Sequence, residues 1–242
     1  MSVTQTGPAP YRTSPKSFVK SSIGRKVFMA VTGLILFGFV IGHMIGNLQI
    51  FLGQNQLNTY AEALKHLKAL TYTVRLVLLV VVIIHIWTAI RLYFENRWSR
   101  PVPYIRENTV QAGLASRTMI WTGLGVFLYV VYHLLQFTFI VTNPQYALLT
   151  DAVGRHDVYS MVVLGFQNPL ISAVYVVAMF LVSYHLSHAL FSLLQTLGLN
   201  SPRLQPALKR LAIGVATFIF VGYTSIPAAV LLNIVKLPTG AR

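Results

Sequence analysis

Long uncharged apolar runs alternate with basic, proline-containing connections along this chain. A membrane-spanning helix needs about 20 apolar residues, and five runs reach that length. They cover approximately residues 27–51, 71–94, 119–141, 170–194 and 211–235. The pattern predicts an all-α integral membrane bundle of five transmembrane helices, forming a single membrane domain over residues 27–242 after a basic segment of residues 1–26.

Composition supports a membrane protein and excludes several other classes. Of the 242 residues, 55% are hydrophobic and only 10% are charged, which is far from the balance of a soluble domain. Because there is no cysteine, disulfides, thiolate-bound zinc and cysteine-ligated iron-sulfur clusters are excluded for this chain. The net charge of +14 lies at the ends of the apolar runs, which argues against nucleic-acid binding. The polar first 26 residues predict no cleavable signal.

The basic residues also predict an orientation. Thirteen of the 19 Lys and Arg residues lie in three segments: before the first run, between the second and third runs, and between the fourth and fifth runs. The other connections and the C-terminus hold the remaining six. Cytoplasmic loops carry an excess of Lys and Arg. We therefore expect a cytoplasmic N-terminus and a C-terminus outside.

Five histidines within the apolar runs are the main chemical signal, because ionisable residues inside a membrane are rare and usually functional. With a rise of about 1.5 Å per residue, His43 and His133 lie roughly 21–24 Å from the cytoplasmic face. On the same scale, His85 and His185 lie roughly 21–23 Å from the outer face. The depths predict an outer pair, His43 with His133, and an inner pair, His85 with His185.

Two neutral imidazoles fill both axial positions of an electron-transfer haem iron. The two pairs therefore predict two haem b groups, stacked across the membrane. Gly38, Gly42 and Gly46 share one face of the first run and are expected to leave room for a porphyrin, or alternatively to let two helices approach closely.

Three further histidines are interpreted differently. His188 lies three residues after His185 on the same helix face and competes with it as a ligand; otherwise it is expected to bond a haem propionate or a backbone carbonyl. His66 and His156 lie in polar connections and are expected at the surface.

Local motifs carry a family resemblance over nearly the whole chain. They are SSIGRK at 21–26, HMIGNLQ at 43–49, NTYAE at 58–62, and YHLSH at 184–188 followed by QTLG at 195–198. With them the chain resembles the single-chain, five-helix, two-haem cytochrome b anchor subunits of bacterial succinate dehydrogenases and fumarate reductases. In that family the fourth-helix ligand stands 13 residues before a glycine, which corresponds to His185 and Gly198. His188 does not fit this spacing, and Ala189 replaces a glycine that commonly follows it.

The resemblance implies a membrane complex in the bacterial cytoplasmic (inner) membrane. A flavoprotein subunit with FAD and an iron-sulfur subunit would dock on the cytoplasmic face, and this chain would exchange electrons with quinone, which we interpret as menaquinone, within the membrane lipid. The chain has no nucleotide fingerprint, so the dicarboxylate reaction is expected in the flavoprotein. The basic cytoplasmic loops would form the docking face.

Two quinone sites are candidates. At an outer site, Glu62 would accept a proton as quinol is oxidised; the alternative is a surface charge paired with Lys65 or His66 at helical spacing. At an inner site, Ser22 and Arg25 resemble the quinone-contacting serine and arginine of related one-haem anchors.

The inner basic residues have a second interpretation. Ser22 and Arg25 are equally suited to anchoring the propionates of the inner haem, for which Arg91 and Arg117 are further candidates. The remaining acids, Asp151, Asp157, Glu95 and Glu107, are interpreted as ordinary loop charges.

Other functions remain as alternatives. The cytochrome b subunit of another respiratory dehydrogenase or reductase predicts the same helices and haems, and only the motifs above argue against it. A haem-free transporter would use the histidines as a proton relay, but the apolar cores contain no acid and no sign of an inverted repeat. A haem-free anchor would leave the two histidine levels unexplained.

Overall fold

The computed structural model describes residues 21–98, 114–199 and 201–238. In these ranges the named elements are all helical, which confirms the all-α prediction. The α-helices are Ser22–Leu48 (α2), Gln54–His66 (α3), Lys68–Trp98 (α4), Leu114–His133 (α5), Val158–Gln167 (α6), Pro169–Thr196 (α7) and Gln205–Leu231 (α8). Short turns are Gln49–Leu52 (η1, 3-10), Leu134–Thr138 (η2, a π-helical turn) and Pro144–Leu148 (η3, 3-10).

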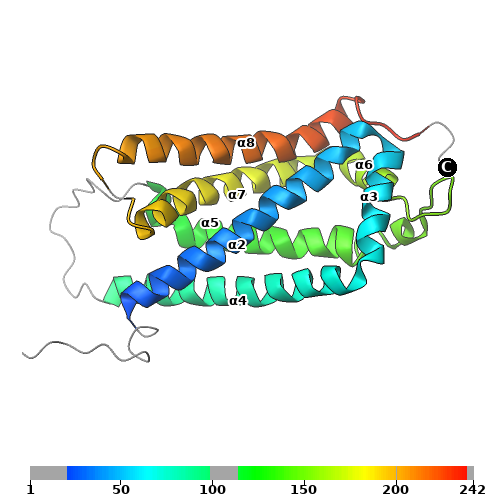
Figure 1. Cartoon of the computed structure of the whole chain (residues 1–242). Coiled ribbons are helices and arrows are strands. Elements are labelled where there is room, and N and C mark those ends of the chain that lie inside the picture. Colours follow the sequence, from blue (N-terminus) through cyan, green and yellow to red (C-terminus); the bar gives the residue numbers. More distant parts are fainter. Residues whose placement is uncertain (1–20, 99–113, 200, 239–242) are drawn as a thin grey trace, which may run out of the picture.

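Five helices are long and apolar enough to cross a membrane, as the apolar runs predicted. The spans are Ile23–Leu52, Lys68–Trp98, Arg117–Thr138, Pro169–Thr196 and Gln205–Leu231. Successive spans run in opposite directions within one bundle (Figure 1). α4 packs along α2, α5 packs along α7, and α8 packs along α7, whereas α4 and α5 touch each other only sparsely.

The ends of two spans differ from the prediction. The last helix begins at Gln205 rather than near 211, because Pro206 suits the first helical turn and the basic side chains that follow can extend to the interface. It ends at Leu231, and Asn233 then adopts a positive φ of 56°. The third span leaves regular α-helix at His133, continues through η2, and stops at Ile140, whose φ is 53°. That φ value is unusual for a β-branched residue.

Two short helices close one end of the bundle, which we call the α3/α6 end (Figure 1). α6 is a ten-residue apolar helix that the apolar pattern did not predict, and α3 packs against it. Asp157 caps its first turn by accepting from the Ser160 backbone N–H. The other end, which we call the basic end, holds the starts of α2, α5 and α8 and the ends of α4 and α7.

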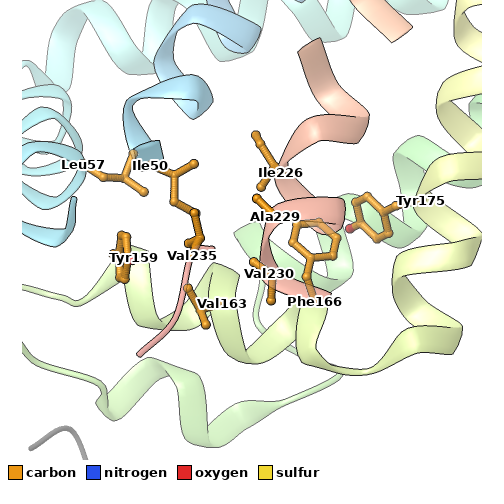
Figure 2. Close-up of a cluster of buried hydrophobic side chains, with 10 residues drawn as sticks. All are labelled: Ile50, Leu57, Tyr159, Val163, Phe166, Tyr175, Ile226, Ala229, Val230 and Val235. Atoms are coloured by element: carbon orange, nitrogen blue, oxygen red, sulfur yellow. The ribbon is translucent and has the colours of Figure 1, made fainter. Parts of the chain in front are cut away.

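Buried apolar side chains gather at the α3/α6 end (Figure 2). The cluster joins η1, α3, α6, α7 and the end of α8. Its members are Ile50, Leu57, Tyr159, Val163, Phe166, Tyr175, Ile226, Ala229, Val230 and Val235. This packing holds the short helices against the spans and thereby positions the side chains around His133.

Candidate functional site

The predicted outer histidines are direct neighbours. His43 lies on α2 and His133 is the last residue of α5, and their ring centroids are 5.9 Å apart with planes at 85°. Two imidazoles on opposite sides of one metal ion, with metal–nitrogen bonds of about 2 Å, place their centroids roughly 6 Å apart. The spacing therefore fits a bis-histidine haem.

The protonation of His133 follows from its hydrogen bonds. Its Nδ1 lies 3.3 Å from the Tyr175 hydroxyl, which itself donates to Oε1 of Gln136 at 2.8 Å. A hydroxyl has one proton; with Oε1 of Gln136 towards Tyr175, that proton goes to Gln136 and Tyr175 would accept from the Nδ1–H of His133. The lone pair is then on Nε2, where a metal would bind.

The predicted inner histidines show the same arrangement. Nδ1 of His85 on α4 lies 3.0 Å from the Thr32 hydroxyl of α2, and Nδ1 of His185 on α7 lies 3.2 Å from the Thr122 hydroxyl of α5. Each threonine donates its own proton to a backbone carbonyl of the preceding turn, Thr32 to Phe28 at 2.8 Å and Thr122 to Met119 at 3.1 Å. With the threonine protons on these carbonyls, each histidine would donate through Nδ1, and both Nε2 atoms would be available as ligands.

A glycine follows each of these threonines and lies beside the histidine ring. A Cβ added at Gly33 would lie 3.6 Å from Cε1 of His85, and one at Gly123 would lie 3.4 Å from Cε1 of His185, which are ordinary contact distances. A Thr-Gly pair on α2 and another on α5 therefore border the two rings in the same way. Neither threonine was predicted as a site residue, although the repeated Thr-Gly dipeptide is visible in the sequence.

His188 lies near His185 but lacks this support. The side chain of His185 is within electrostatic reach of both His85 and His188. Within the described ranges, a hydroxyl partner is seen for His185 and no hydrogen bond is seen for the His188 ring. The geometry therefore favours His185 as the ligand.

The three glycines that were predicted to share one face of α2, namely Gly38, Gly42 and Gly46, do not act alike. A Cβ at Gly46 would lie 2.7 Å from the Tyr60 hydroxyl, so this glycine serves the close approach of α3, as the packing alternative expected. Gly38 and Gly42 border open space, with no atom within 4 Å of an added Cβ. The glycines that face the histidine rings are Gly33 and Gly123.

Glu62 makes the two contacts expected if it is a surface charge paired within its own helix. Its carboxylate lies 3.5 Å from Nζ of Lys65 and 3.1 Å from Nε2 of His66, and its side chain is 25% exposed. His66 is exposed, as expected. The role of Glu62 as proton acceptor stays a prediction.

At the basic end, Arg25 pairs with an acid that the sequence placed in a loop. Glu95 lies within α4 and its carboxylate is 2.8 Å from the Arg25 guanidinium, whose Nε is buried without a hydrogen-bond partner in the described ranges. Arg91 lies over the Trp87 ring at 5.3 Å and, like Arg117 on α5, is exposed. The side chain of Ser22 lies outside the described residues, and so does Glu107.

A shallow groove of about 250 Å³ lies on α4 beside this ion pair. Trp87, Ile90, Arg91, Phe94, Glu95 and Trp98 line it. Aromatic rings beside an arginine near a helix end are typical of the membrane–water interface.

The two acids of the 150–157 segment are structural rather than ordinary loop charges. Asp157 is 2% exposed and accepts from Gln54 at 2.7 Å and from Asn58 at 2.9 Å. Asp151 pairs with Arg155 at 2.7 Å, and Arg155 also donates to two side chains of α3. These bonds fasten the segment to α3.

Both carboxyl groups are stabilised in their charged form. Burial alone raises the pKa of Asp151, but hydrogen bonds from Arg155, Asn58 and the Val153 backbone outweigh it and lower the pKa to about 2. Burial is likewise outweighed at Asp157, whose pKa is lowered by hydrogen bonds from Ser160, Asn58 and Gln54. His156 is partly buried, with Nδ1 3.2 Å from the Leu149 carbonyl.

Comparison of the chain with family models, with curated proteins and with solved structures gives no match. In the described part of the chain, no group of three or more His, Cys, Asp or Glu side chains is placed to hold a metal ion.

Proposed function

We propose that this chain is the di-haem cytochrome b membrane-anchor subunit of a succinate:quinone oxidoreductase. It would pass electrons between an iron-sulfur subunit and membrane quinone through two bis-histidine haems. The observations that carry the proposal come from four histidines on four spans. The rings of His43 and His133 are direct neighbours. Nδ1 of His85, His133 and His185 each lies beside a hydroxyl, an arrangement that would keep Nε2 available.

The chain's own residues would hold and orient each haem. His43 and His133 would bind one, and His85 and His185 the other, while Thr32, Thr122 and Tyr175 fix the ligating form of their histidines. Bound in this way, haem supplies reversible one-electron transfer. Thr32 and His43 are 11 residues apart on α2, about 16 Å along the axis, which separates the two levels across the membrane.

The basic end would face the cytoplasm of a bacterial cell, so that α3 and α6 lie outside. This orientation follows from the excess of Lys and Arg beside that end. The iron-sulfur subunit and the flavoprotein with FAD would dock there, and the dicarboxylate reaction would take place in the flavoprotein. The chain is then an enzyme only as a subunit of the complex.

The quinone, which we propose is menaquinone, would react close to the outer haem. Tyr60 of α3 packs on Gly46, three residues after His43, so α3 borders that site. Glu62 follows on the same helix and is our candidate proton acceptor. If Glu62→Gln left quinone-linked turnover intact in a complex whose haems dithionite still reduces, this role would be wrong.

A reduced-minus-oxidised optical spectrum with haem quantification on the purified membrane complex tests the function. We expect two b-type haems per chain, and one haem per chain in His43→Ala and in His85→Ala. His66→Ala is the matched control, because His66 is exposed and outside both pairs. A complex without haem would overturn the proposal. Two haems without copurifying flavin and iron-sulfur would point instead to another respiratory cytochrome b.

A further inference from the structure

A buried polar chain leads from His133 into the apolar cluster at the α3/α6 end. Its members are the His133 ring, the Tyr175 hydroxyl of α7 and the Gln136 amide of η2. Gln136 is completely buried and Tyr175 is 5% exposed (Figure 2 shows Tyr175 beside Phe166). Buried amides are costly unless bonded, so Gln136 in this cluster requires an explanation.

The wider turn of η2 accounts for the position of Gln136. Single π-helical turns inside helices are rare and frequently mark functional sites. Here the turn begins directly after His133, and it places Gln136 against Tyr175 on the neighbouring helix. Nε2 of Gln136 faces Gly165 of α6, where an added Cβ would lie 3.3 Å away, and it has no partner in the described ranges.

The orientation of this amide decides which nitrogen of His133 carries the proton. With Oε1 towards Tyr175, the hydroxyl donates to Gln136 and accepts from Nδ1–H of His133. If the amide were turned over, Nε2 would donate to the hydroxyl, which would then donate to Nδ1. The proton of His133 would move to Nε2, and no metal could bind there.

The same bond restricts the plane of the His133 ring. Tyr129, Phe137 and Tyr175 surround that ring with centroids 5.7–6.1 Å away, and only Tyr175 offers it a hydrogen bond in the described contacts. The ring of His43 is held differently, by stacking on Phe39 at 5.2 Å and 18°. The two planes consequently stand at 85°.

We propose that Tyr175 and Gln136 are positioning residues that hold His133 in its Nδ1–H form, with its ring plane across that of His43. They thereby tune the reduction potential and the magnetic spectrum of the haem bound by this pair. The inference rests on the proposed function and deepens it.

The direction of the effect follows from ligand chemistry. An acceptor at Nδ1–H makes the imidazole a stronger electron donor to the metal. Stronger donation stabilises ferric iron and lowers the reduction potential. Loss of the Tyr175 hydroxyl should therefore raise the potential of this haem, and the freed ring should rotate relative to His43.

Redox titration and low-temperature electron paramagnetic resonance on the intact complex test the proposal. For Tyr175→Phe we expect both haems to be retained, one midpoint potential to rise, and the low-spin signal of that haem to change its g values, while the other haem is unaffected. Tyr132→Phe is the matched control, because Tyr132 packs edge-on against Tyr175 at 6.1 Å and makes no hydrogen bond to His133 in the described contacts.

Gln136→Met is a second variant that keeps the side-chain length and removes the amide. It should raise the midpoint potential of the same haem, because the Tyr175 hydroxyl loses the acceptor of its proton and becomes a weaker acceptor for His133. This variant tests the proposal even if the Tyr175→Phe complex does not assemble. Two haems with potentials and g values unchanged in both variants would overturn this inference alone. A wild-type complex without haem would overturn the proposed function as well.

Discussion

At the scale of single residues, the direction of a hydrogen bond determines which histidine nitrogen is free to bind a metal. A threonine within a helix commonly donates to a carbonyl of the preceding turn, and Thr32 and Thr122 both do so. A threonine that donates in this way can accept a second hydrogen bond, and in an apolar span it would accept from the Nδ1–H of the neighbouring histidine.

The histidines could be predicted from the sequence, but their partners could not. An ionisable residue stands out in an apolar run, whereas Thr32 and Thr122 have nearly neutral hydropathy. Their role depends on which neighbouring helix each faces, and this is a property of packing. Likewise Gly33 and Gly123 are two glycines among 16, and only the assembled bundle brings them beside histidine rings.

Thr122→Val should change one haem only. Valine keeps the shape of threonine but removes the acceptor, and leaving a buried Nδ1–H unpaired costs about 1–3 kcal/mol. We expect both haems to remain, with a raised midpoint potential for the one held by His85 and His185. Redox titration measures this. Thr224→Val is the control, since Thr224 also donates to a carbonyl in its own helix but contacts no histidine among the described bonds.

The choice between His185 and His188 has a direct test. Because Thr122 supports His185, we expect His185→Ala to lose the inner haem and His188→Ala to retain two haems per chain. Haem quantification on the two purified variants distinguishes them. Loss of one haem in His188→Ala, with two haems retained in His185→Ala, would assign the ligand to His188 instead of His185.

At the scale of elements, the spans were predictable and the short helices were not. Hydropathy over about 20 residues identifies a span, but the ten residues of α6 are too few to register. The start signal was nevertheless present: Asp157 precedes an apolar run and caps it. α6 forms where it does because Asn58 of α3 donates to Asp157 and accepts from the Tyr159 backbone, contacts that no local pattern specifies.

Asp157→Ala should loosen the α3/α6 end. It removes a helix cap, worth about 1 kcal/mol, and leaves the buried Asn58 amide with an unpaired donor, which costs about 1–3 kcal/mol. We expect a lower melting temperature and faster proteolysis within residues 139–157. Asp157→Asn retains one acceptor oxygen and should lose less. Equal stability of Asp157→Ala and wild type would contradict this account of the cap.

The same bonds should make this end insensitive to pH except in acid. The pKa values of Asp151 and Asp157 are lower in the folded protein than in an unfolded chain, where Asp titrates near ~3.9. A lowered folded pKa gives stability that is present above the unfolded pKa and is lost as pH falls towards the folded value. Proteolysis of residues 139–157 should therefore stay constant above about pH 5 and accelerate between about pH 4 and 2. Acceleration beginning near neutral pH would contradict the prediction.

At the scale of the whole molecule, the two ends of the bundle differ in charge and in closure. Most of the Lys and Arg residues in the described ranges lie towards one end, and the other end is closed by α3, α6 and the bonded 150–157 segment. In the proposed complex, the partner that exchanges electrons with the inner histidines would reach them from the basic end.

Single cysteines can report that orientation, because the chain has none of its own. Lys65→Cys lies on α3, where the native side chain is 67% exposed, and Arg203→Cys lies at an exposed position before α8. In intact cells a membrane-impermeant maleimide should label Lys65→Cys at once, and should label Arg203→Cys only after permeabilisation. Further labelling of Arg203→Cys after the soluble subunits are stripped would indicate that they cover the basic end. The reverse order of labelling would show the opposite orientation. Glu62 would then lie on the cytoplasmic side, and the basic end could not be the docking face for cytoplasmic subunits.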